Sequence, residues 1–202
     1  FDCDTTVKTD ETTFVETLLM VAGDPGQLGI AGGIITDSVT GGTVADVELT
    51  VRKGWNKASG TTIQTGRTDA SGNYRLSLPQ GNYTIEMKKA GYTTGYLNII
   101  AQGSETLNQN APLTPSSSAV ISGDLRAILT WGESPSDLDS HLLGPIAGSV
   151  DRFHIYFGRK SIYQNSILSA FLDLDDTTSY GPETTTIYSI NNSGLYSFYV
   201  HD

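Results

Sequence analysis

Apolar and polar residues alternate with a period of two along much of the chain. The alternation is clear in residues 47–51, 74–78 and 83–87, where every second residue is Val, Leu, Ile, Met or Tyr. Segments rich in Gly, Asn and Pro separate these stretches, as at residues 71–73 and 79–82. A period of two is typical of strands with one buried face, and Gly and Asn favour the tight turns between them. The pattern predicts an all-β sandwich between about Gly32 and Leu113.

A second strand-and-turn pattern follows a Pro-, Ser- and Thr-rich stretch at residues 111–118, whose composition is typical of a linker. The strands predicted after it are residues 125–131, 138–142, 153–157, 168–174, 184–190 and 195–200. We therefore predict two tandem β-sandwich modules, residues 30–115 and residues 119–202, with the boundary near residue 117.

Residues 1–29 form a separate N-terminal segment in this division. Residues 13–21 are β-branched and apolar and predict one strand, which Asp24-Pro25-Gly26 ends. Residues 7–20 echo residues 100–113 at the end of the first module. We therefore expect residues 1–29 to include the last strand of a preceding module. Since the first residue is Phe1 rather than Met, we expect a longer exported protein.

Several ordered motifs give the first module a family resemblance. They are Gly33-Ile34-Ile35-Thr36-Asp37, Thr68-Asp69-Ala70-Ser71-Gly72-Asn73-Tyr74, Leu78-Pro79-Gln80-Gly81-Asn82-Tyr83 and Lys89-Ala90-Gly91-Tyr92. The module resembles the carboxypeptidase regulatory-like domain. The resemblance implies a prealbumin-like (transthyretin-like) sandwich of seven strands, which serves as a spacer or accessory module and not as a catalytic domain.

The second module resembles a group of bacterial exported β-sandwich modules often found just after such a domain. The segments that carry the resemblance are Leu125-Arg126-Ala127-Ile128-Leu129-Thr130-Trp131, Ser136-Asp137-Leu138-Asp139-Ser140-His141-Leu142, Leu172-Asp173-Leu174-Asp175-Asp176 and Tyr180-Gly181-Pro182-Glu183-Thr184. The resemblance implies a secreted or cell-surface location.

Charge and composition limit the classes of partner that we expect the chain to bind. The net charge is −10, whereas nucleic-acid and anionic-lipid surfaces need clustered Lys and Arg. We therefore expect no nucleic-acid partner, and no apolar run is long enough for membrane insertion. Cys3 is the only cysteine, so the chain forms no internal disulfide. The expected partners are other domains of the same polypeptide and an extracellular glycan or protein ligand.

Acidic residues in the second module predict a calcium site. Asp137 and Asp139 are two residues apart, as are Asp173 and Asp175, so each pair would lie on one face of a strand. If the two strands are neighbours, four carboxylates crowd together and repel one another, and a hard cation reverses that repulsion. Asp176 and Glu183, expected on the following loop, would complete the shell. The alternative is a solvated acidic strand face, or aspartates that cap turns.

Catalytic motifs are missing from the sequence. No Gly-x-Ser-x-Gly segment accompanies His141, His154 and His201, so we expect a protein that is not an enzyme, with no catalytic residues. His141 shares a strand face with Asp137 and Asp139, but a zinc site lacks a second histidine nearby in the sequence.

Loop aromatics leave one functional alternative open. They are Trp55, Tyr92, Tyr96, Tyr163 and Tyr180. Such rings build stacking platforms for sugars. The primary expectation is a spacer and adhesion module, and the alternative is a carbohydrate-binding accessory of a secreted glycoside hydrolase or protease.

Overall fold

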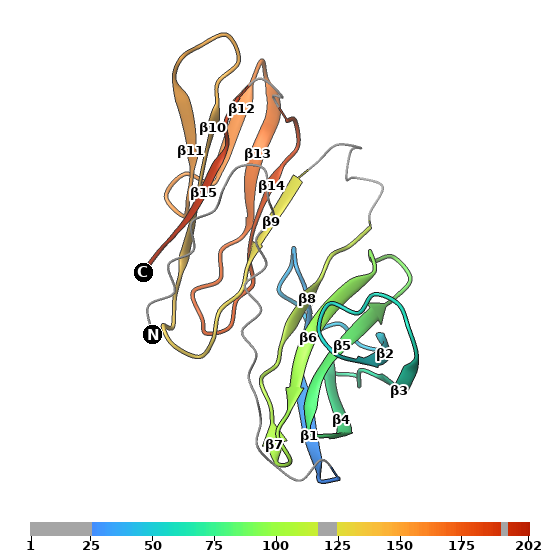
Figure 1. Ribbon diagram of the computed structural model, residues 1–202. Coiled ribbons are helices and arrows are strands. Elements are labelled where there is room, and N and C mark those ends of the chain that lie inside the picture. The colour runs from blue at the N-terminus through green and yellow to red at the C-terminus, as the bar shows by residue number, and fades with distance from the viewer. Residues whose placement is uncertain (1–25, 117–124, 191–193) are drawn as a thin grey trace.

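The computed structural model describes residues 26–116, 125–190 and 194–202. These residues contain fifteen β-strands and no helix. The strands form four sheets, which pair into two sandwiches (Figure 1). This confirms the predicted all-β fold of two tandem sandwiches. The predicted strand at residues 13–21 and the predicted boundary near residue 117 lie outside the described residues, so the exact division of the chain stays a prediction.

The first sandwich consists of β1 (Leu28–Asp37), β2 (Glu48–Lys53), β3 (Thr62–Arg67), β4 (Asn73–Pro79), β5 (Gly81–Lys88), β6 (Gly95–Ala101), β7 (Glu105–Thr106) and β8 (Ala111–Leu113). One sheet has the order β3-β2-β5-β6, and in the other β1 lies between β4 and the two short strands. Both β7 and β8 run parallel to β1, one after the other. They act as one interrupted edge strand, so seven strand positions remain, as expected for a prealbumin-like sandwich.

The core of the first sandwich is built from the alternating positions. In β4 the residues Tyr74, Leu76 and Leu78 are all buried, and the intervening residues are exposed. Tyr83 is also buried, and its hydroxyl donates to the Pro79 carbonyl at 2.7 Å. Each buried aliphatic side chain contributes about 1.5–3 kcal/mol through removal of apolar surface from water.

The predicted turn between β3 and β4 has the expected chemistry. One carboxylate oxygen of Asp69 accepts hydrogen bonds from the amides of Ser71 (2.8 Å) and Asn73 (2.9 Å). Gly72 has a φ of 76°, in the left-handed region that glycine adopts without strain. The sequence Asp-Ala-Ser-Gly therefore makes a tight turn that carries the chain from β3 in one sheet to β4 in the other, so it is not the turn of a hairpin.

The second sandwich consists of β9 (Leu125–Leu129), β10 (Asp139–Pro145), β11 (Arg152–Ile155), β12 (Ser161–Gln164), β13 (Ile167–Leu174), β14 (Glu183–Ile187) and β15 (Ser197–His201). Its sheets have the orders β11-β10-β15 and β12-β13-β14-β9. The short strand β12 lies outside the segments that the alternation indicates. Figure 1 shows the two sheets packed face to face.

The second sandwich has the smaller core among the described residues. Its buried apolar cluster holds Leu142, Phe153, Ile155, Ala170, Leu172 and Ile187, compared with sixteen residues in the first sandwich. Since stability scales with the apolar area buried on folding, the second sandwich has less hydrophobic stabilisation to draw on. Interactions between its two sheets outside this core therefore matter more to it.

Candidate metal centre

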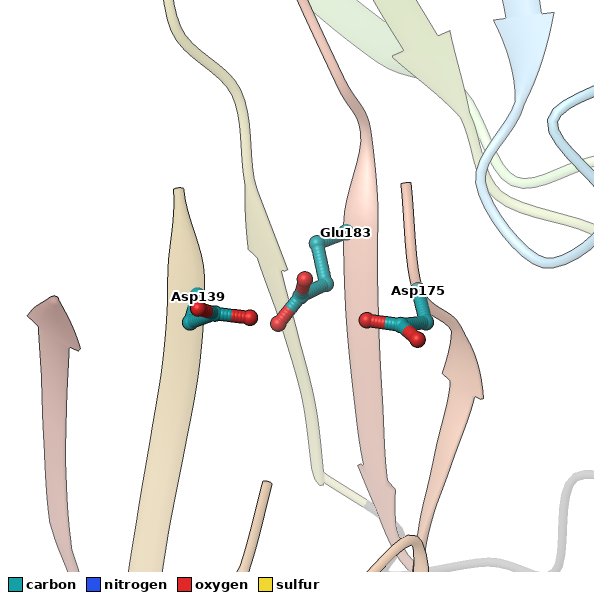
Figure 2. Close-up of side chains that lie close together, drawn as sticks. All are labelled: Asp139, Asp175 and Glu183. Carbon is teal, nitrogen blue, oxygen red and sulfur yellow. The ribbon is translucent and has the colours of Figure 1, made fainter. Parts of the chain in front are cut away.

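Three carboxylates from both sheets of the second sandwich meet at one end of the core. Asp139 is the first residue of β10, and Glu183 is the first residue of β14 in the opposite sheet. Asp175 directly follows β13. One ligand oxygen from each lies within 4.8 Å of the other two. Figure 2 shows the carboxylate of Glu183 between those of Asp139 and Asp175, with the three groups turned toward one another.

Glu183 is the buried member of this carboxylate cluster (Asp139, Asp175 and Glu183). Only 1% of the residue is exposed. Its Oε1 accepts a hydrogen bond from the Ser140 amide at 2.7 Å and a second one from the Ser140 hydroxyl. Its Oε2 is buried and has no hydrogen-bond partner among the described residues. A buried carboxylate oxygen without a partner loses its hydrogen bonds to water, and no protein group replaces them. This oxygen can therefore accept one strong interaction.

Electrostatics at the carboxylate cluster reflect this burial and crowding. Burial raises the pKa of Glu183, and the charges of Asp175 and Asp139 raise it further, against the lowering effect of the Ser140 hydrogen bonds. The pKa of Asp137 is also raised, by burial first and then by Asp139, Asp175 and Asp176. Without a cation, these groups therefore resist ionisation.

One internal cation already lies at the edge of the cluster. The Lys160 ammonium is 2.7 Å from Oδ2 of Asp175. This ion pair is half exposed on the lysine side, so water screens it and its net contribution is small. It uses one oxygen of Asp175 and neutralises one of the three charges in the cluster.

The remaining predicted ligands lie in other positions. Asp137 precedes β10 and is not part of a strand. Asp173 accepts a hydrogen bond from the Tyr188 hydroxyl at 3.2 Å, and Asp176 accepts from the amide of Thr178 at 2.7 Å. Asp176 therefore caps a turn, which the alternative of turn-capping aspartates anticipates.

Two parts of the predicted geometry are wrong. The strands that carry the aspartate pairs are not neighbours, because β10 and β13 belong to opposite sheets. Asp173 and Asp175 do not share a face, because the pairing of β13 with β14 shifts between Leu172 and Leu174. A bulge of this kind adds one residue to a strand and reverses the alternation beyond it. The carboxylate of Asp175 consequently lies close to that of Glu183, and the carboxylate of Asp173 does not.

His141 has a partner that the sequence spacing does not reveal. Its Nδ1 lies 2.8 Å from Nε2 of His154, on the neighbouring strand β11. The second histidine that the sequence spacing does not supply is therefore brought close in space by the pairing of β10 with β11. Burial lowers the pKa of His141, as do His154 and His201, and Asp139 raises it. A signal was available, since both histidines occupy outward positions of the alternation.

The loop aromatics named for a sugar site are spread over both sandwiches. Tyr92 packs against the first core, and Tyr96 lies on β6. Tyr163 lies on β12, and Tyr180 lines a recess between the sandwiches. These rings therefore do not form one platform.

The family comparison concerns the first sandwich. Residues 31–114 match the carboxypeptidase regulatory-like domain. The match confirms the predicted resemblance, covers fewer than half of the 202 residues, and agrees with the prealbumin-like order of strands described above. None of the curated proteins compared with the chain matches its sequence.

Several solved structures share parts of the fold. The minor pilin GBS52 of Streptococcus agalactiae is 16% identical, with a TM-score of 0.33, and the match covers 47% of this chain and 48% of the pilin. The chain thus spans about half the length of that protein. A streptococcal ancillary pilin is 13% identical, with a TM-score of 0.36 and coverage of 88% and 54%.

A DUF3823 family protein from Parabacteroides merdae is 13% identical, with a TM-score of 0.34, and the match covers 79% of each chain. At such TM-scores the similarity does not extend to the arrangement of the whole chain. No helix among the described residues has the length and apolar character needed to cross a membrane.

Proposed function

We propose that the two sandwiches are non-catalytic spacer and adhesion modules of a secreted or cell-surface bacterial protein, and that calcium bound at the carboxylate cluster stiffens the second module. The observation that carries the calcium site is the buried, unpartnered Oε2 of Glu183, within reach of the carboxylates of Asp139 and Asp175. The spacer role rests on the resemblance of residues 31–114 to an accessory domain.

Repulsion within the carboxylate cluster supports a cation of high charge. Two unit charges 4.8 Å apart repel by about 1 kcal/mol in water and by about 3 kcal/mol at the effective dielectric constant of a protein near its surface. The single charge of Lys160 offsets only part of this. A divalent ion would turn each repulsion into an attraction, and the ligands are all oxygens, which suit calcium. Asp137 is the nearest candidate for a further ligand.

The position of the cluster explains how calcium would act. Asp139 belongs to the sheet β11-β10-β15, and Glu183 begins a strand of the opposite sheet. An ion between them would tie the two sheets together at one end of the sandwich. Because the second sandwich has the smaller core, such a tie would supply a substantial share of its stability.

Thermal unfolding of the whole chain in excess calcium and in chelator tests this proposal. We expect calcium to raise the Tm of the second sandwich, since the ion binds only the folded state. The Asp139→Ala variant should lose that gain. Asp151→Ala serves as the control, because Asp151 is exposed and lies in a turn outside the cluster. An unchanged Tm in the wild-type protein would leave the aspartates as a solvated face and remove the calcium site.

The recess between the sandwiches favours one second function, carbohydrate binding. It is lined by Asn108 and Asn110 from the first sandwich and by Trp131 and Tyr180 from the second. The Trp131 indole N–H is buried without a partner among the described residues. Amides, a free indole donor and aromatic rings are the groups that bind sugars. Glycan-array binding that is lost in Trp131→Phe would support this function, and no binding to any glycan would reject it.

A further inference from the structure

The three histidines of the chain lie on one outer sheet face of the second sandwich. His141 is on β10, His154 on β11 and His201 on β15. The register places His141 opposite Tyr199, and Asp139 opposite His201. The neighbouring residues Leu142, Phe153 and Ile155 point into the core. Strand alternation therefore fixes the histidines on the side away from the core.

The rings of His141 and His154 are held in a defined arrangement. Nδ1 of His141 and Nε2 of His154 are 2.8 Å apart. The ring of His141 stacks on Tyr156, with centroids 5.6 Å apart, and on Tyr199, with centroids 4.8 Å apart. The ring of His154 also stacks on Tyr156, at 4.6 Å. Stacking on two sides restrains the ring of His141, and stacking on Tyr156 restrains the ring of His154, so the two nitrogens stay close together.

Two imidazole nitrogens this close either share one proton or bind one metal ion. Imidazole suits borderline divalent ions such as Zn²⁺, Cu²⁺ and Ni²⁺. Two nitrogens on a tetrahedral zinc ion, each at about 2.0–2.1 Å, lie about 3.3 Å apart. To bind such an ion, the nitrogens of the pair separate by about half an ångström, and each ring turns by about 35° so that its lone pair points at the ion instead of at the other ring.

We propose that His141 and His154 bind a divalent transition-metal ion on the outer face of the sheet β11-β10-β15, and that His201 supplies a third ligand. The ring of His201 is exposed, and its centroid lies 6.0 Å from that of His141. A change of side-chain rotamer brings it toward the pair. The Tyr199 hydroxyl, 3.3 Å from Nε2 of His154, lies beside the same site.

This histidine site differs from the carboxylate cluster in its ligand atoms. Nitrogen ligands favour transition metals, whereas calcium takes oxygen ligands. The two sites are therefore separable by ion and by mutation. Zinc binding at the histidines should survive Glu183→Gln, and the calcium response should survive His154→Gln. The inference does not depend on the calcium proposal.

Isothermal titration of the whole chain with Zn²⁺ and with Ni²⁺ tests the site. We expect one strong site per chain and affinity at least about tenfold weaker in His141→Gln and in His154→Gln. His201→Gln should weaken binding less. Glutamine keeps most of the side-chain volume without an imidazole nitrogen, and far-ultraviolet circular dichroism checks that each variant is folded. Tyr163→Phe is the control, because Tyr163 is exposed on β12 in the opposite sheet, away from the histidines.

Nitrogen-15 spectra of the histidine rings provide a readout in the unmutated protein. Zinc should shift the Nδ1 signal of His141 and the Nε2 signal of His154 together. Unchanged ring signals at saturating zinc would overturn the proposal and assign the short contact to a shared proton. Zinc affinity that is retained in His154→Gln but lost in Glu183→Gln would also overturn it, because the ion would then lie at the carboxylates.

Discussion

Replacing Glu183 by Gln distinguishes the destabilising effect of the buried charge from the role of the carboxylate as a calcium ligand. Glutamine keeps an Oε1 that accepts the two hydrogen bonds from Ser140. Its amide group takes the place of the unpartnered Oε2 and donates toward the nearby carboxylates. In chelator, the substitution removes two repulsions that are worth about 1–3 kcal/mol each at the observed separations.

Part of this repulsion is already offset in the wild-type protein, because the Lys160 ammonium pairs with Asp175. We therefore expect Glu183→Gln to stabilise the calcium-free second sandwich by about 1–3 kcal/mol in total. For a module of this size, that gain raises the Tm by about 5–15 °C. The same variant should lose the calcium-dependent rise in Tm, since one of the three ligands is gone.

The pH dependence of stability tests independently whether the Glu183 charge destabilises the calcium-free protein. The pKa of Glu183 is higher in the folded state, so the calcium-free protein should lose stability as the pH rises through that value from 4.5 upward. Glu183→Gln should remove this loss. Differential scanning calorimetry of both proteins in chelator measures it. A variant that is less stable than the wild type in chelator at neutral pH would refute the account of a strained, cation-free cluster.

Three further predictions concern other features of the two sandwiches. Lys160→Met removes the ion pair with Asp175, so it should lower the Tm in chelator. It should also strengthen calcium binding in a titration, and an unchanged calcium affinity would show that Lys160 does not compete with calcium for Asp175. The pKa of Glu86 is lowered, chiefly by the hydrogen bond from Lys88 and then by the one from Arg52. The first sandwich should therefore lose stability as the pH falls below about 4.5, and the Glu86→Gln variant should lose less stability over the same range in acid unfolding curves. Gly72→Ala should destabilise the first sandwich by about 2 kcal/mol in urea unfolding, because φ is positive there and the new Cβ would lie 2.8 Å from the Ile35 carbonyl oxygen. Gly91→Ala is the control: φ is also positive there, but the space is open, so the variant should lose only about 1 kcal/mol of stability through backbone strain.

Period-two alternation predicted the strands well where a strand has a single buried face, as in β4, although β5 and β14 are buried on both faces. Every second residue of β4 is buried, as the apolar pattern indicates, and the Asp69–Gly72 turn is determined by local chemistry. These features depend on residues close in the sequence. Strand pairing across the sandwich does not, and the alternation alone did not place β10 and β13 in opposite sheets.

The candidate site shows the same limit at the level of single residues. Asp139, Asp175 and Glu183 were all among the predicted ligands, since acidic residues near strand ends are visible in the sequence. The separation of Asp173 from Asp175 depends on a bulge in the pairing of β13 with β14, which no local motif marks. The contact between His141 and His154 depends likewise on the register of β10 with β11.

The parallel pairing of β1 with β7 and β8 determines how the first sandwich responds to tension. The chain enters β1 at Leu28 and leaves β8 at Leu113, and the two strands point the same way. A pull on the two ends would slide the strands along each other and load their hydrogen bonds together rather than one at a time. Long-range bonds such as that from the Ile34 amide to the Asn110 side chain lie in this seam. Shear resistance of the module would therefore come from the pairing of its first strand with its last strands.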